Sequence, residues 1–127
     1  MFHEIDQTDI KPFKALLGEA AGVMASHVIY PEVDTQPASL SKIWLTDLLR
    51  SKLGYDGVIF TDDMGMKAAK FDESPIQTVW RALDAGADIV LLCNEFDVMD
   101  AVIDAWPQTN EQPRGNHESL NCLLAQP

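Results

Sequence analysis

The stretch GYDGVIFTDDMGM, residues 54–66, decides how this chain is expected to fold. A glycine-containing turn leads into a short apolar run, and the run ends in two adjacent acids, Asp62 and Asp63. A run that is apolar throughout is typical of a strand buried on both faces of a parallel sheet. Two carboxylates at the end of such a strand either cap the loop that follows or take part in chemistry, and the pattern alone leaves these interpretations level.

Two further apolar runs lie at similar intervals, at residues 21–30 and 87–94. Helical patterns flank the three runs, at residues 8–20, 39–54, 74–86 and 95–106. The third helix has the clearest boundaries, because Ser74 suits the N-cap, Pro75 the first turn and Gly86 the end. The order α-β-α-β-α-β-α predicts an α/β protein with a parallel sheet.

Two α/β architectures fit this order. One is a small three-layer sandwich, and the other is part of an eight-stranded βα barrel, which normally needs about 250 residues. Three strands leave a small sheet with two open edges, so a length of 127 residues indicates a fragment. We expect residues 1–106 to form the folded part and residues 107–127, rich in Pro, Asn, Gln and Gly, to form a loosely structured tail.

Composition and charge disfavour several classes of partner. The net charge of −11 argues against nucleic acid and anionic membranes, and no apolar run approaches the roughly 18 residues of a membrane span. The N-terminus lacks a secretory signal pattern, so we expect a cytoplasmic protein. Cys93 and Cys122 lack zinc-type spacing with histidine, and Cys93, within an apolar run, is expected to be a buried thiol. We expect no metal ion and no cofactor.

Polar residues gather where the predicted strands end, and both architectures bind ligands at the carboxyl ends of their strands. Asp62 and Asp63 end the middle strand, His27 lies near the end of the first and Asn94 follows the third. Alternation along the strand points the two acids to different sides, so that one faces the site and the other bonds backbone donors in the loop. His27 in an apolar run is by default a core histidine bonded to a backbone group.

A phosphoreceiver domain is the non-enzymatic alternative with an aspartate at a strand end. Such a domain also needs an acidic pair after its first strand and a lysine after its last. The corresponding segments here read SHVIYPEVD and LLCNEFD, which lack both features. The sequence therefore disfavours this class.

The segment VMASHVIYPEVDTQPASLSKIWLTDLLRSKLGYDGVIFTDDMGMKAA, residues 23–69, resembles the second half of the catalytic barrel of glycoside hydrolase family 3. It is most similar to the bacterial cytoplasmic β-N-acetylglucosaminidases (β-hexosaminidases) of peptidoglycan recycling. Their pattern M-A-H-V-x-Y-P-x-x-D-x-x-P-A-x-x-S precedes W-L-x-x-x-L-R-x-x-L-G-F-x-G-V-I-F-S-D-D-L-x-M. The similarity continues through RALDAGADIVLLCN, residues 81–94. It implies a partial (β/α)8 TIM barrel, formed by the last three βα units.

The resemblance also implies a role for each candidate site residue. The first acid of the family's S/T-D-D stretch is the catalytic nucleophile, which here is Asp62. A retaining glycosidase attacks the anomeric carbon with an ionised carboxylate, which must be held rigidly. Asp63 then supports the loop or the nucleophile, His27 lines the sugar pocket, and Met64 and Met66 form an apolar wall. The implied ligand is an N-acetylglucosamine-containing glycan.

The chain departs from the family pattern mainly upstream. The family's general acid/base comes from a D-S/T-H dyad after a K-H-F-P-G-H-G segment, and neither motif occurs in this sequence. Thr61 replaces the usual Ser, and Met64-Gly65 replaces Leu-Ser. We therefore expect a chain that carries the nucleophile without its acid/base and is inactive alone. The alternative is a non-catalytic module that self-associates through the open sheet edges or binds sugar weakly.

Overall fold

Three parallel strands form the centre of the molecule. The structure is a computed structural model that describes residues 2–66 and 73–106. The strands, in sheet order, are β1 (Gly22–Ala25), β2 (Val58–Asp63) and β3 (Ile89–Leu91). Each lies inside one of the three apolar runs, so the predicted parallel sheet is confirmed. The proposed tail, residues 107–127, lies outside the described residues.

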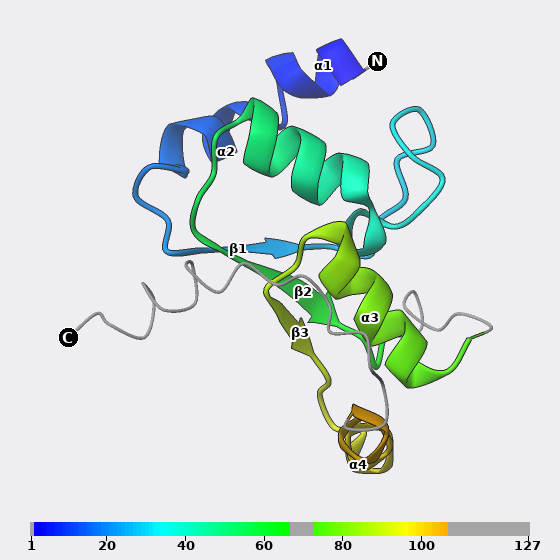
Figure 1. Ribbon diagram of the computed structural model, residues 1–127. Helices are drawn as coiled ribbons and strands as arrows, with labels where there is room; N and C mark the ends of the chain where they lie inside the picture. The colour runs from blue at the N-terminus through cyan, green and yellow to red at the C-terminus, as the bar shows by residue number, and fades with distance from the viewer. Residues whose placement is uncertain (1, 67–72, 107–127) are drawn as a thin grey trace.

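Helical segments precede and follow the strands. They are α1 (Phe2–Gln7), α2 (Lys11–Leu16), η1 (Ala38–Leu40), η2 (Ile43–Lys52), α3 (Pro75–Ala85) and α4 (Phe96–Ala105). Figure 1 shows η2 and α3 on the same side of the sheet and α4 beyond the end of β3. The α/β class and three successive strand–helix units are therefore confirmed. None of the helices in residues 2–66 and 73–106 has both the length and the apolar character that a membrane span requires.

The predicted first helix, residues 8–20, is shorter than expected. It is formed by α2, Lys11–Leu16, and another short helix, α1, precedes the predicted range. Pro12 lies in the first turn of α2, as expected. Proline has no backbone N–H, so Pro12 cannot donate to the carbonyl of Thr8 as a continuous helix would require. The Thr8 hydroxyl donates instead to the carbonyl of Glu4 at 2.8 Å, at the end of α1. The chain turns there before α2 begins.

The second predicted helix is wound more widely than an α-helix. The Leu53 N–H donates to the carbonyl of Leu48, five residues earlier, which is π-helical spacing. The Ser41 hydroxyl oxygen accepts a bond from the Trp44 N–H at 3.2 Å, in the first turn of the helix. Gly54, at φ 70°, follows its last turn. The helix lies within the predicted range 39–54 but is shorter, and its wide winding was not predicted.

The exposure of three apolar side chains differs from the sequence prediction. Ile43, in the apolar pattern of the predicted helix 39–54, is 39% exposed, since it is the first residue of η2. Met24 of β1 is 56% exposed, although a strand buried on both faces was predicted. Cys93 is an exposed free thiol, because β3 ends at Leu91 and Cys93 lies in the following loop.

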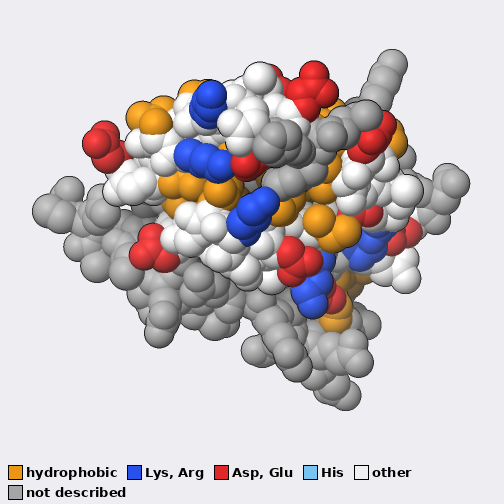
Figure 2. Space-filling model, turned by 90° about the horizontal axis from the view of Figure 1, so that it is seen from above, with side chains coloured by type: hydrophobic (Ala, Val, Ile, Leu, Met, Phe, Trp, Pro, Cys, Tyr) orange, Lys and Arg blue, Asp and Glu red, His pale blue; other side chains and the backbone are white. Residues whose placement is uncertain are grey.

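The core fills the space between the sheet and its helices. Its buried members are Ala25, Leu40, Leu45, Tyr55, Ile59, Met64, Ala82, Ala85 and Ala87. Packing at α1 and α2 is looser, because a cleft of about 350 Å³ lies between these helices, β1 and η2. Figure 2, which views the molecule from above, shows apolar side chains at the surface among charged ones.

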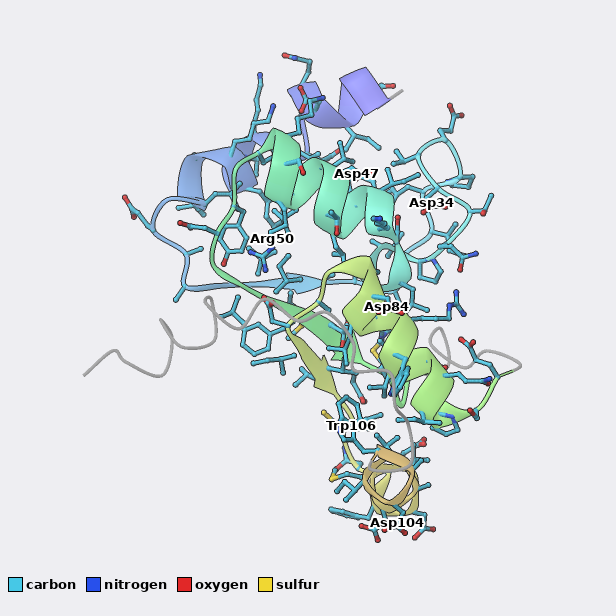
Figure 3. The ribbon with its side chains drawn as sticks, in the orientation of Figure 1. Asp34, Asp47, Arg50, Asp84, Asp104 and Trp106 are labelled. Carbon is cyan, nitrogen blue, oxygen red and sulfur yellow. The ribbon has the colours of Figure 1, made fainter. Side chains whose placement is uncertain are left out.

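Two aromatic pairs connect the outer elements. The rings of Trp80 in α3 and Trp106 after α4 meet edge to face, with centroids 6.1 Å apart, so α4 is attached to α3 (Figure 3). Tyr30, in the loop after β1, packs on Trp44 of η2 with ring centroids 5.1 Å apart. Each pair joins elements that are distant in sequence.

An ion pair lies at the amino ends of the strands. Arg50 points from η2 toward the sheet (Figure 3) and bonds Asp88 at 2.6 Å. The same guanidinium donates to the carbonyls of Tyr55 and Gly57, ahead of β2. Asp88 Oδ2 also accepts a bond from the Ile59 N–H at 2.9 Å. The side chain of Asp88 is fully buried, so its charge depends on these partners.

Neutralising Asp88 is expected to destabilise the fold. Asp88→Asn leaves the Arg50 guanidinium, whose side chain is 17% exposed, without its counter-charge. Loss of one member of a buried pair costs roughly 3–5 kcal/mol, and urea denaturation measures the change in unfolding free energy. The matched control is Asp47→Asn, an exposed residue of η2, which is expected to change it by less than about 0.5 kcal/mol. Equal effects of the two substitutions would contradict this assignment.

Gly86 permits the close approach of α3 and η2. It follows α3 at φ 121°, where a β-carbon is disfavoured, and a β-carbon there would lie 2.7 Å from Thr46 Oγ1 of η2. The Thr46 hydroxyl donates to the carbonyl of Ala85 at 2.8 Å. A side chain at Gly86 therefore disturbs both the backbone and this contact.

The two helix-ending glycines are expected to differ in their tolerance of alanine. Gly54→Ala places a left-handed alanine in open space, which costs about 1–2 kcal/mol. Gly86→Ala adds the clash with Thr46, so it is expected to lower the unfolding free energy by a larger amount. Thermal and urea unfolding of the two variants make the comparison, and an equal loss would argue against the close contact.

Candidate active site

The carboxyl end of β2 carries the two acids, one strand away from each sheet edge. Ile59 and Thr61 are fully buried, and Ile59 packs in the core on the helix-covered side. Alternation therefore points Asp62 to the opposite side of the sheet. Asp62 is partly exposed, and its Oδ1 accepts a bond from the Asp63 N–H at 2.8 Å. The nucleophile candidate is thus held at one oxygen.

Asp63 connects the ends of all three strands. Its Oδ1 accepts bonds from the N–H groups of Gly65 and Cys93, each at 2.9 Å. Its carbonyl accepts a bond from His27 Nε2 at 2.9 Å. The Cys93 and Gly65 N–H groups lower the pKa of the Asp63 carboxyl below its ordinary value, although burial opposes them. The expectation that one acid bonds backbone donors in the loop is confirmed for Asp63.

His27 is buried, with both ring nitrogens bonded inside the protein. Nε2 lies 2.9 Å from the Asp63 carbonyl, and Nδ1 lies 2.7 Å from the Ser39 hydroxyl. A carbonyl can only accept, so Nε2 carries the hydrogen, and in the neutral ring Nδ1 accepts from Ser39. This is the satisfied core histidine that the sequence favours by default. Contact between a ring nitrogen and a sugar would break one of these bonds.

The two methionines after β2 lie in different environments. Met64 is 7% exposed and belongs to the core cluster, whereas Met66 is 44% exposed. Of the two, Met66 presents surface beside the site, and its role as an apolar wall stays a prediction. Met64 contributes to packing beneath the loop.

Polar bonds hold the loops that follow β1 and β2. Asp34 accepts a bond from the Ser41 hydroxyl at 2.5 Å, and this bond is the main cause that lowers the pKa of Asp34. Arg81 of α3 donates to Gln36 in the first loop at 2.5 Å and bonds Glu73 after the second. These two loop segments are thereby tied to η2 and α3.

Ser39 is a further residue of the site that the sequence did not predict. It is fully buried and bonds His27, but it occupies an unspecified position of the P-A-x-x-S pattern, which gives no signal for it. Asn94, just beyond β3, adopts φ 60°, a conformation that asparagine tolerates. In the described ranges, no group of three His, Cys, Asp or Glu residues could hold a metal ion.

Comparison with known proteins identifies the class. The sequence profile described as "Glycosyl hydrolase family 3 N terminal domain" matches residues 2–114. The chain belongs to this family, as the resemblance implied. Its three parallel strand–helix units are consistent with part of a barrel.

Among its relatives, the chain is similar to enzymes named beta-hexosaminidase. It is 43% identical over 125 residues to the protein of Shewanella frigidimarina, covering 97% of this chain and 37% of the relative. It is 48% identical over 98 residues to that of Glaesserella parasuis, covering 76% and 29%. The chain thus spans about a third of the length of these curated relatives.

Solved structures show the same fold. NagZ from Neisseria gonorrhoeae in complex with N-trifluoroacetyl-D-glucosamine superposes with a TM-score of 0.75 at 34% identity, covering 98% of this chain and 39% of that one. The β-N-acetylglucosaminidase from Thermotoga maritima has a TM-score of 0.72 at 31% identity, covering 84% and 25%. Both structural similarities extend over most of the chain.

The Asp63 carboxylate is expected to make the unfolding free energy depend on pH in the acidic range. Because its folded-state pKa is lowered, its contribution is present above its ordinary pKa and is lost as pH falls through the folded value. The unfolding free energy should therefore fall below about pH 4. Asp63→Asn should be less stable at neutral pH and should fall less steeply in acid.

Urea denaturation at a series of pH values between neutral and strongly acidic measures this dependence. Asp97→Asn, an exposed position of α4, is the matched control and is expected to keep the slope of the parent chain. An identical acid dependence in the parent chain and in Asp63→Asn would contradict the assignment.

Proposed function

We propose that this chain forms the nucleophile-bearing part of a retaining glycoside hydrolase that releases terminal β-linked N-acetylglucosamine. The observation that carries the proposal is the placement of Asp62 at the carboxyl end of the central strand, with one carboxylate oxygen held by the Asp63 N–H at 2.8 Å. Family membership supports it, as do relatives named beta-hexosaminidase. In this proposal the three βα units are the last units of a (β/α)8 barrel.

Asp62 fits the chemistry of the first step. A retaining hydrolase attacks the anomeric carbon with a carboxylate oxygen while an acid protonates the leaving oxygen, which forms a covalent glycosyl-enzyme. The bond from the Asp63 N–H restrains Oδ1 and so sets how the carboxylate is presented. Water then hydrolyses the intermediate with the same acid/base group acting in the opposite direction.

The acid/base belongs to sequence outside residues 1–127 in this proposal. The D-S/T-H dyad and the K-H-F-P-G-H-G segment of the family do not occur in this sequence. General acid/base catalysis contributes about 10²–10⁴-fold, and the upstream residues that grip the sugar would also be lacking. We therefore expect the 127-residue chain to be inactive when it is assayed alone.

The proposed substrate is a muropeptide derived from peptidoglycan, and the proposed location is the cytoplasm. The similar NagZ structure holds N-trifluoroacetyl-D-glucosamine, an analogue with the 2-acylamino sugar that such a substrate presents. His27 and Met66 lie near the proposed nucleophile, and Met66 offers an exposed apolar surface to the sugar.

Grafting tests the nucleophile. Residues 1–127 replace the matching segment of the Shewanella frigidimarina beta-hexosaminidase, and the graft is assayed on an aryl β-N-acetylglucosaminide. The graft should hydrolyse it, and Asp62→Asn should lower kcat by roughly 10³-fold or more. Asp97→Asn in the same graft is the control and should keep full activity. Full activity of the Asp62→Asn graft would sink the nucleophile assignment.

A non-catalytic module that self-associates is the second candidate. In the described sheet, β1 and β3 each pair only with β2, so each has an outer edge open to another strand. Sedimentation of the chain as a dimer or larger, together with an inactive graft, would favour this candidate. A monomer with an active graft would favour the hydrolase.

A further inference from the structure

We propose that Ser39 and His27 are positioning residues that hold the backbone of Asp63 and thereby aim the Asp62 carboxylate, a role that rests on the proposed function of Asp62 as nucleophile. Four groups are connected in succession by hydrogen bonds: the Ser39 hydroxyl, the His27 ring, the Asp63 backbone and the Asp62 carboxylate. We call this series the line from Ser39 to Asp62. The line begins in η1 and ends at the candidate site.

Asp63 is the residue through which the line passes. Its N–H donates to Asp62 Oδ1 at 2.8 Å, and its carbonyl accepts from His27 Nε2 at 2.9 Å and from the Met66 N–H at 3.1 Å. The carbonyl and the N–H belong to the two peptide groups that flank the Asp63 α-carbon. A ring held against the carbonyl therefore limits rotation of the backbone that presents the N–H to Asp62.

Burial makes the Ser39–His27 bond difficult to replace. Ser39 is fully buried and His27 is 7% exposed, so water cannot readily substitute for a lost partner. The Ser39 N–H donates to the carbonyl of Ser26 at 3.0 Å, which anchors Ser39 beside the end of β1. The hydroxyl is thus presented to Nδ1 from a fixed backbone.

The two partners of the ring hold it from both sides. The Asp63 carbonyl can only accept, so Nε2 carries the hydrogen, and the Ser39 hydroxyl bonds the other nitrogen, Nδ1, at 2.7 Å. Without the hydroxyl, Nδ1 loses the partner that holds this side of the ring. The bond from Nε2 to the Asp63 carbonyl can then tilt or lengthen.

Two buried serines provide a matched pair of variants. Ser39→Ala removes the hydroxyl that bonds His27, and Ser41→Ala removes one that bonds Asp34 at 2.5 Å. Both serines are nearly fully buried, at 0% and 1% exposure, so a loss that reflects only burial or stability should be similar in the two variants. A loss specific to Ser39 reports on the line to Asp62.

The kinetic test uses the active graft described above. Ser39→Ala should lower kcat by roughly 10–100-fold, because a small displacement of a reacting group costs rates of this order, and KM should change less than about twofold. Ser41→Ala should leave kcat nearly unchanged, and Ser39→Thr, which keeps a hydroxyl, should recover most of the loss. Equal loss of kcat in Ser39→Ala and Ser41→Ala would overturn the inference.

An NMR measurement tests the role of Ser39 without requiring catalytic activity. In the graft labelled with ¹⁵N, the His27 ring should carry hydrogen on Nε2, and Ser39→Ala should change both the ¹⁵N shift of Nδ1 and the amide shift of Asp63. Ser41→Ala should change neither. An unchanged ring and Asp63 amide in Ser39→Ala would overturn the inference. An inactive parent graft would count against the proposed function, and the NMR result would still decide whether Ser39 holds Asp63.

Discussion

The Asp63 carboxylate is the interaction on which the arrangement of the three strand ends depends. One oxygen receives N–H groups from the loop after β2 and from the residue two places beyond β3, and the carbonyl of the same residue receives the His27 ring from the end of β1. A charged acceptor forms stronger bonds to N–H donors than a neutral one does. A single residue therefore joins three chain segments that are far apart in sequence.

The two ends of the strands are organised differently. At the amino ends, Arg50 and Asp88 satisfy one another and the neighbouring backbone, in a place with little access to solvent. At the carboxyl ends, Asp62 stays partly exposed and bonds only one described backbone group. This division is usual for barrel enzymes, in which the amino ends of the strands provide stability and the carboxyl ends carry the chemistry. The chain belongs to a family for which that arrangement is expected.

Features with local causes were predictable from the sequence. The ends of α3 follow from Ser74, Pro75 and Gly86, whose effects need no knowledge of distant residues. The separate orientations of Asp62 and Asp63 follow from alternation along a strand, once the strand is recognised.

Features that depend on distant contacts were not predictable. The bond between Ser39 and His27 requires η1 to lie against the end of β1. The exposure of Ile43 depends on where η2 begins, and the exposure of Cys93 depends on where β3 ends. Apolar composition alone cannot locate a strand end, because the residues beyond it have the same character.

The aromatic pairs supply two separate spectroscopic reporters. Trp80 and Trp106 meet at 6.1 Å where α4 rests on α3, and Trp44 meets Tyr30 where η2 rests on the loop after β1. Indole rings held this close and at fixed angles produce near-ultraviolet circular dichroism, which disappears when their packing becomes mobile. The detachment of α4 and the loosening of the loop after β1 therefore each change the near-ultraviolet spectrum, without any added label.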